Sequence, residues 1–182
     1  MRFPRAAGVL LHPTSFPGRY GIGDFGHEAY RFLDFLAGAK QAYWQILPLG
    51  PTGYGDSPYQ CFSAFAGNPL LISPDIMVAD GYLPKTAVTQ VPSFPAHAVD
   101  FGPVIAYKLD LLRQAYVYFS EQGTADQREV FDQFCQEQTD WLEDFAVNLS
   151  QAYPSESLVR IVRKCLNKKG MFVRENSRWF AA

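Results

Sequence analysis

An α/β fold with about one parallel βαβ unit is the fold class that the sequence predicts, from three observations. Residues 7–11 form a short apolar run without helical periodicity, which is typical of a buried strand. Residues 42–47 are aromatic and β-branched and stop at Pro48, so they predict a second strand. Residues 27–39, between the two, have the apolar spacing of a helix. Strands joined through a helix pair in parallel, with a right-handed crossover.

Composition restricts the classes of protein to which the chain can belong. Of 182 residues, 48% are hydrophobic and 19% are charged, a balance typical of a soluble globular protein. No apolar run approaches the roughly 20 residues of a membrane helix, which argues against a membrane partner. A net charge of −2 argues against nucleic-acid binding. Three widely separated cysteines predict neither a disulfide framework nor a metal site, and the apolar run near the start is too short for a secretory signal, so a cytoplasmic location is expected.

The first half of the chain alternates between ordered elements and turn-rich segments. Pro13 lies just after the first strand, and a loop rich in glycine and proline follows over 16–26. Asp24 is interpreted as an early cap for the helix. The predicted buried face of that helix consists of Ala29, Phe32, Leu33, Leu36 and Ala39. A single βαβ unit leaves both strand edges and one sheet face open, so further structure must complete it.

The second half is predicted to be mainly helical. Residues 49–74 form a long loop rich in proline, glycine and aromatic residues, at the end of a parallel strand where α/β proteins place ligand contacts. Residues 85–103 are predicted to be an extended connection because they hold four prolines. Helices are predicted over 103–121 and 125–150. Their apolar faces contain Tyr107, Leu111, Leu112, Ala115, Tyr118 and Phe119 in the first, and Phe131, Phe134, Cys135, Trp141, Leu142 and Phe145 in the second.

Three segments follow from this organisation. Residues 1–75 contain the βαβ unit and the long loop, and residues 76–150 contain a connection and a helical subdomain. Residues 151–182 form a basic tail, with seven basic side chains against one acidic side chain from 158 onward. We interpret the tail as solvated, with binding of an anionic partner as the alternative.

Segment 47–60 holds the densest set of polar and aromatic side chains. It places two tyrosines, a carboxylate, a serine and an amide on a loop stiffened by prolines. Sugars are recognised by such sets, because aromatic rings cover the apolar face of a pyranose while carboxylates and amides bind its hydroxyls. The alternative is a packed turn in which both tyrosines bury their rings. His12 and Trp44, at strand ends, are interpreted as structural.

Four segments of this sequence resemble the N-terminal region of bacterial 4-alpha-glucanotransferases, also called amylomaltases or disproportionating enzymes. They read RAAGVLLHPTS at 5–15, YGIGD at 20–24, YWQILPLGPTGYGDSPYQ at 43–60 and FSAFAGNP at 62–69. The resemblance continues more loosely to WLEDF at 141–145 and is lost after about residue 146.

The resemblance implies a fold and an activity. The fold is a (β/α)8 TIM barrel with helical insertions, of which the predicted βαβ unit forms the first part. The activity is that of a glycosyltransferase of carbohydrate metabolism, which moves segments of α-1,4-glucan to an acceptor such as glucose or a maltodextrin by a retaining double displacement. No metal or organic cofactor is implied, and the implied partners are malto-oligosaccharides and other α-1,4-glucans.

The resemblance also implies substrate-binding residues. It places carbohydrate contacts at Ser57, Pro58, Tyr59 and Gln60, on the acceptor side of the cleft. Tyr54 resembles an aromatic platform of a second glucan site, and Phe101 stands where other members have the partner tyrosine. Asp56 and Asn68 are further polar candidates, interpreted more as loop-ordering groups than as ligands.

No catalytic carboxylates are assigned within this chain. In the family, the nucleophile, the acid/base and the stabilising carboxylate lie on later barrel strands, so the chain is expected to be a fragment that stops before them. Asp24, Asp56 and Asp100 are separate loop carboxylates, whereas retaining chemistry needs two carboxyl groups about 5–5.5 Å apart. Two alternatives stay open. In the first, the chain is a catalytically inactive module that binds malto-oligosaccharide. In the second, it is an unrelated hydrolase with a similar loop.

Overall fold

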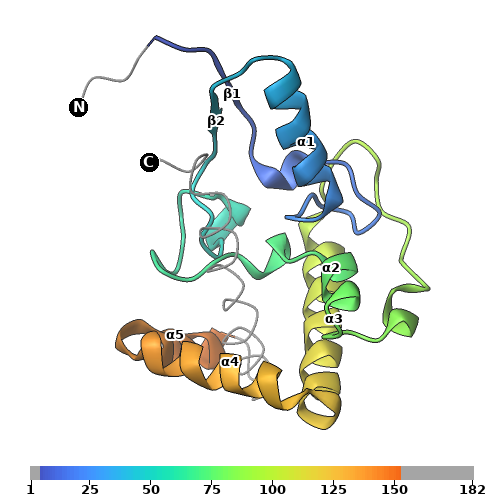
Figure 1. Ribbon diagram of the computed structural model, residues 1–182, viewed down its shortest axis with the longest axis vertical. Helices are drawn as coiled ribbons and strands as arrows, with labels where there is room; N and C mark the ends of the chain where they lie inside the picture. The colour runs from blue at the N-terminus through green and yellow to red at the C-terminus, as the bar shows by residue number, and fades with distance from the viewer. Residues whose placement is uncertain (1–4, 153–182) are drawn as a thin grey trace.

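The structure is a computed structural model that describes residues 5–152. The predicted βαβ unit is confirmed as β1 (Gly8–Leu10), α1 (His27–Gly38) and β2 (Tyr43–Gln45). The two strands pair in parallel, with Val9 opposite Trp44. Figure 1 shows this sheet and α1 at one end of the molecule.

Aromatic packing holds α1 against one face of the sheet. The rings of Phe16 and Phe32 lie 5.3 Å apart, and the Trp44 ring lies 5.7 Å from Phe16 and 5.3 Å from Phe32. Ala29 and Leu36 of the predicted helix face are buried. The spacing of these side chains along α1 therefore determines which face of the sheet the helix covers.

The rest of the described chain is helical. It contains α2 (Pro74–Ala79), α3 (Phe101–Gln122), α4 (Ala125–Glu137) and α5 (Thr139–Ala152). The helix predicted over 103–121 is confirmed as α3. Figure 1 shows α3 extending between the two ends of the molecule, with α4 and α5 at the end opposite the sheet.

The prediction of a single helix over 125–150 is wrong, because the chain turns at Gln138 between α4 and α5. The Gln138 backbone leaves the helical region, with φ −111° and ψ 17°. The Thr139 hydroxyl donates to the carbonyls of Cys135 (3.0 Å) and Gln136 (2.9 Å). Threonine can satisfy backbone carbonyls in this way, which offers the chain an alternative to a continuous helix.

Helix α2 was not predicted, although its start signal is present in the sequence. Ser73 precedes Pro74, and its side-chain oxygen accepts from the amide of Ile76. Serine at the cap followed by proline in the first turn is a common way to begin a helix. The predicted loop over 49–74 is otherwise confirmed, with short 3-10 turns at Tyr54–Asp56 and Pro69–Leu71. The predicted connection over 85–103 contains one such turn, Lys85–Val88.

The main hydrophobic core lies in the helical part. Helix α3 is its centre and buries six apolar residues and one lysine, namely Val104, Lys108, Leu109, Leu111, Leu112, Ala115 and Phe119. Side chains from α2 and α5, such as Met77 and Leu142, pack against this face. A capping box of Thr124 and Gln127 begins α4 directly after α3. Of the apolar face predicted for the first long helix, Leu111, Leu112 and Ala115 face this core, whereas Tyr118 is only half-buried and belongs to no core cluster of the described residues.

The tail predicted over 151–182 falls almost entirely outside the described residues. Within residues 5–152, no helix combines the length and hydrophobicity needed to cross a membrane.

Candidate functional site

The loop that carries the predicted site residues is closed by backbone pairing. Thr52 and Cys61 form an isolated antiparallel bridge. Next to it, the Gly53 amide donates to the Gln60 carbonyl at 2.8 Å. At the loop base, the Asn68 amide donates to the Leu49 carbonyl at 2.7 Å. The segment between Gly53 and Gln60 is thus held at both ends and projects as one unit.

The tip of this loop brings together Ser57, Pro58, Tyr59 and Gln60. The Ser57 carbonyl accepts from the Gln60 amide at 3.1 Å, and the Ser57 hydroxyl oxygen accepts from the Tyr59 amide at 3.3 Å. The Cys61 thiol donates to the Pro58 carbonyl at 2.9 Å. Local bonds therefore fix the backbone, while the residue Tyr59 is 71% exposed.

Asp56 lies in an unusual backbone conformation before the tip. Gly55 and Asp56 both have positive φ, at 67° and 53°. Aspartate is among the few residues that adopt this left-handed region at modest cost, and glycine adopts it freely. The Asp56 amide donates to the Gly53 carbonyl at 3.2 Å. Tyr54 begins the same turn, and its side chain lies outside the described part of the structure.

Asn68 and Phe101 occupy different surroundings from the loop tip. Asn68 is buried, and its side-chain oxygen accepts from the Leu70 amide at 2.9 Å, which caps the turn that follows. Phe101 begins α3 and packs against a small cluster that contains Ile22 and Val104. Among the described side chains, no ring contact joins Phe101 to the tip of the loop.

A buried ion pair joins the glycine-rich loop to α3. Lys108 Nζ lies 3.3 Å from Asp24 Oδ2 and donates to the Ile72 carbonyl at 2.7 Å. The Lys108 side chain is 2% exposed and that of Asp24 is 13% exposed. Burial raises the pKa of Asp24 above its ordinary value, although Lys108 and the amide of Gly26 oppose this shift. Asp24 does not cap α1 through its first-turn amides; it bonds the Gly26 amide at 2.9 Å and Lys108.

A second polar group surrounds Tyr20 on the same loop. The Tyr20 hydroxyl donates to Asp75 Oδ1 at 2.6 Å, and Arg19 lies 2.8 Å from the same oxygen. Burial raises the pKa of Tyr20, and the neighbouring Asp75 carboxylate adds to the shift. The Lys108 ammonium lies 5.6 Å from the centre of the Tyr20 ring. Sequence reasoning predicted neither the Asp24–Lys108 pair nor the group around Tyr20. The signal that could have indicated the pair was Lys108, a lysine within the apolar face of α3.

His12 and Trp44 make contacts that suit the structural role predicted for them. Trp44 Nε1 donates to the Leu11 carbonyl at 2.7 Å. His12 Nδ1 lies 2.8 Å from the Thr14 hydroxyl, and its Nε2 is buried without a hydrogen-bond partner among the described residues. Burial lowers the pKa of His12 below its ordinary value, and the Pro48 carbonyl opposes the shift. The imidazole is therefore favoured in its neutral form.

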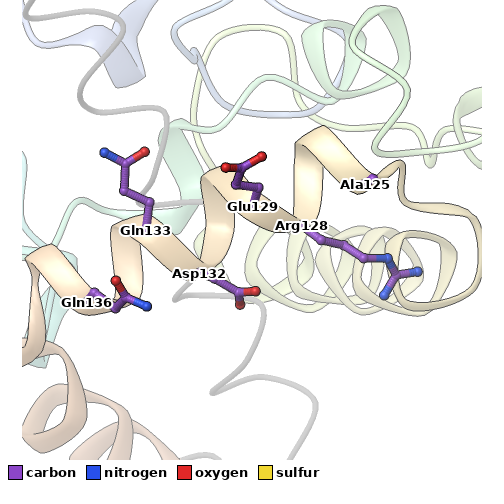
Figure 2. Close-up of a pocket in the computed structure, with 6 residues that line it drawn as sticks. All are labelled: Ala125, Arg128, Glu129, Asp132, Gln133 and Gln136. Carbon is purple, nitrogen blue, oxygen red and sulfur yellow. The ribbon is translucent and has the colours of Figure 1, made fainter.

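A hollow of about 580 Å³ lies along the exposed face of α4. Its lining consists of Ala125, Arg128, Glu129, Asp132, Gln133 and Gln136, all from this one helix. Figure 2 shows that these side chains point to different sides of the helix rather than toward a common point. None of the predicted site residues line it, so it is a solvated helix surface.

The described carboxylates are engaged separately rather than assembled for catalysis. Asp24 pairs with Lys108, and Asp75 pairs with Arg19. Asp100 precedes α3 and is exposed. Among the described residues, no three histidine, cysteine or acidic side chains gather as metal ligands would. The arrangement offers an exposed aromatic and polar loop for binding, held on a rigid base.

Comparison with known proteins gives one consistent answer. A family model described as 4-alpha-glucanotransferase matches residues 11–158. The 4-alpha-glucanotransferase of Synechocystis sp. is 51% identical over 143 residues, which cover 79% of this chain and 28% of that protein. The 4-alpha-glucanotransferase of Thermus thermophilus is 50% identical over 147 residues, which cover 81% of this chain and 29% of that protein.

A solved structure agrees with the sequence comparisons. The amylomaltase from Streptococcus agalactiae in complex with acarbose matches with a TM-score of 0.76 and 33% sequence identity. The match covers 97% of this chain and 40% of that chain. The chain thus spans less than a third of the length of the two curated relatives, and less than half of the solved one.

Proposed function

The chain belongs to the 4-alpha-glucanotransferase family, and from that premise we propose that it takes part in moving α-1,4-glucan segments to an acceptor such as glucose or a maltodextrin. In such a reaction a carboxylate attacks the anomeric carbon and a carboxylic acid protonates the departing oxygen. A sugar hydroxyl then takes the place of water and attacks the glycosyl intermediate. We infer that the chain forms the first βαβ unit of a (β/α)8 barrel and carries its acceptor-side binding loop.

The observation that carries this proposal is the tip of the loop between Gly53 and Gln60. Its backbone is fixed by local hydrogen bonds, so little conformational entropy is lost when a ligand binds. Tyr59 is exposed, and its ring offers a face on which a pyranose can stack. Ser57 and Gln60 lie beside it and supply a hydroxyl and an amide for the sugar hydroxyls.

The catalytic carboxylates are proposed to come from a segment outside these 182 residues. Retaining transfer needs a nucleophile and an acid about 5–5.5 Å apart on either side of one glycosidic bond. Asp24 forms an ion pair with the buried Lys108, and Asp75 forms one with Arg19, so we assign both carboxylates a structural role. In this proposal the chain binds and positions the glucan, and the chemistry is performed elsewhere in the assembled enzyme.

Binding of maltoheptaose, measured by isothermal titration calorimetry, tests the proposed role of the loop. We expect Tyr59→Ala to weaken binding by about tenfold, because the loss of one stacking ring is worth about 1 kcal/mol or more. Phe35→Ala is the matched control, since Phe35 is an aromatic residue of α1 that is 60% exposed. Equal affinities of the wild type and Tyr59→Ala would refute the proposed site.

Maltotriose tests the division between binding and catalysis. We expect the isolated chain to bind malto-oligosaccharide and to release no glucose from maltotriose. Release of glucose with growth of longer maltodextrins would show that the chain holds its own catalytic carboxylates. Asp24, Asp56 and Asp100 would then be replaced by asparagine one at a time.

A further inference from the structure

We propose that Trp141 of α5 is a positioning residue for the loop tip between Gly53 and Gln60, and that it acts through the ring of Phe65. The connecting segment 61–66 joins that ring to the tip. This inference rests on the binding role proposed above for the tip. It adds that the affinity for glucan depends on a contact with the helical end of the molecule, made between residues that are distant in the sequence.

The connecting segment is ordered by hydrogen bonds at both of its ends. The Phe62 amide donates to the Pro51 carbonyl at 3.1 Å, across the loop. The Ser63 hydroxyl oxygen accepts from the amides of Phe65 at 3.2 Å and Ala66 at 3.1 Å. A serine that bonds nearby amides in this way stabilises a turn of the backbone. We therefore expect a displacement of Phe65 to move the tip rather than to be absorbed by the segment.

The far end of the connecting segment contacts the helical core at two adjacent residues. Ala66 belongs to the same buried cluster as Leu142 and Phe145 of α5. The Phe65 ring stacks on Trp141, with the ring centroids 6.1 Å apart and the ring planes at 23°. Stacking at such a distance is a favourable arrangement of two aromatic rings. Figure 1 shows the segment between β2 and α2 passing above α5, where this contact is made.

Trp141 is itself held in place within the helical part. Its Nε1 donates to the Gln138 side-chain oxygen at 2.8 Å. Its ring lies 6.1 Å from that of Phe145, which is buried. A side chain that is fixed by a hydrogen bond and by a buried neighbour presents its ring in one orientation. Because Gln138 lies at the turn between α4 and α5, this turn determines where the Trp141 ring meets Phe65.

The exposure of Phe65 makes the contact with Trp141 important for its position. Phe65 is 63% exposed, whereas its neighbour Ala66 is 1% exposed. A ring with most of its surface in water has few packing neighbours, so the loss of Trp141 is expected to free Phe65 while Ala66 stays buried. A glucan that binds the tip would then have to order the connecting segment, and this entropic cost lowers the affinity.

Calorimetric titration with maltoheptaose tests the proposal. We expect Trp141→Ala and Phe65→Ala each to weaken binding about fivefold, because each makes the ligand order the same segment. The double variant is also expected to bind about fivefold more weakly than the wild type, because both substitutions remove one shared contact. Trp141→Phe keeps a ring that can stack and is expected to bind within about twofold of the wild type.

Phe131→Ala is the matched control. Phe131 lies on α4, and its ring is 6.0 Å from that of Phe119 in α3, so this variant also loses an aromatic contact of the helical part. We expect its affinity for maltoheptaose to equal that of the wild type. Urea denaturation of every variant sets a temperature at which all of them are folded for the titrations. If Trp141→Ala does not fold, Phe65→Ala decides the question, because most of the Phe65 surface is exposed.

Hydrogen exchange at the tip gives a readout that does not need a ligand. The amides of Gly53 and Gln60 donate to carbonyls within the tip. We expect both amides to exchange with deuterium about threefold faster or more in Trp141→Ala and Phe65→Ala, because local opening of the tip becomes easier. Phe131→Ala is expected to exchange at these two amides as the wild type does.

The other outcomes separate this inference from the proposed function. Unchanged affinity of the two single variants, or unchanged exchange of the tip amides in both, would overturn the positioning role. Losses that add in the double variant would overturn the action of Trp141 through Phe65. An equal loss in Phe131→Ala would assign the effect to general destabilisation. If the wild type binds no maltoheptaose, the proposed function fails, and the exchange rates at the tip alone decide whether Trp141 positions it.

Discussion

The helical end and the sheet end of this molecule both contain apolar residues, but they differ in how far those residues are buried. Helix α3 buries seven of its 22 residues, and Leu109, Leu111, Leu112 and Ala115 among them pack in a core shared with α2 and α5. The strands β1 and β2 bury none of their residues fully, and Leu10 and Tyr43 stay largely exposed. Apolar character alone therefore does not stabilise an element, because stabilisation requires a partner that removes the surface from water.

The difference also identifies what holds the molecule together. The glycine-rich loop over 16–26 is tied to the helical part by the pair between Asp24 and Lys108 and by the bond between Tyr20 and Asp75. The long site loop is tied to itself by backbone bonds. The segment that follows the site loop contributes Ala66 to the helical core. Four measurements test this difference between the two ends.

The largest effect is expected at the buried ion pair. Replacing Lys108 with methionine removes the cation beside the buried Asp24 carboxylate, and Asp24→Asn removes the carboxylate beside the buried Lys108 ammonium. Each change is expected to lower the free energy of unfolding by about 3–5 kcal/mol, measured by urea denaturation. The double variant should lose much less than the sum of the two. Additive losses would show that the two side chains contribute independently.

A matched pair of leucines compares the two ends directly. Leu111 in α3 is 2% exposed, whereas Leu10 in β1 is 57% exposed. We expect Leu111→Ala to cost about 2–5 kcal/mol in urea denaturation, because it removes packed methyl groups and leaves a cavity. Leu10→Ala is expected to change the same free energy by no more than about 0.5 kcal/mol. Equal losses would mean that the open sheet face is packed in solution.

A smaller effect is expected at the start of α2. Ser73 accepts from the Ile76 amide, and Ser73→Ala removes this cap. Thermal unfolding should show a loss of about 1 kcal/mol. Ser73→Asp keeps a cap acceptor and should retain more stability than Ser73→Ala. The reverse order would indicate that the burial of Ser73, rather than its cap, is what matters.

The smallest effect is expected from the titration of His12. Because burial lowers its pKa in the folded state, the unfolded chain binds more protons near and below the ordinary value of about 6.5. The stability contributed by His12 is therefore present above that pH and is lost as the pH falls below it. Chemical denaturation at pH 7.5 and pH 5.5 should show a decrease for the wild type. His12→Gln should show a smaller decrease, and an equal one would assign the effect to other groups.

Sequence reasoning was most successful where local periodicity decides the structure. The strands at Gly8 and Tyr43 and the helices α1 and α3 follow from spacing within a single segment. It failed at Gln138, where one threonine hydroxyl that bonds to the preceding helix accompanies a turn in an otherwise helical pattern. It also overlooked α2, whose serine and proline start signal was overshadowed by the preceding loop.

The predicted site residues also fall into a group that is adjacent in the chain and a group that is not. The residues from Ser57 to Gln60 are adjacent in the chain, so the sequence alone placed them together. Asn68 and Phe101 are not part of that tip, because one is used as a buried cap and the other packs at the start of α3. Their surroundings depend on residues that the pattern of the loop does not include.

By itself, the sequence determined the family, the βαβ unit and the segment that carries the candidate binding loop, because each depends on motifs or periodicity within a short stretch. Folding brings Asp24 to Lys108, 84 residues further along the chain, and covers one face of the sheet while Leu10 on the other face stays exposed. Burial and ion pairing depend on contacts between segments that are distant in the sequence. Such contacts form only when the chain has folded, and local composition does not encode their partners.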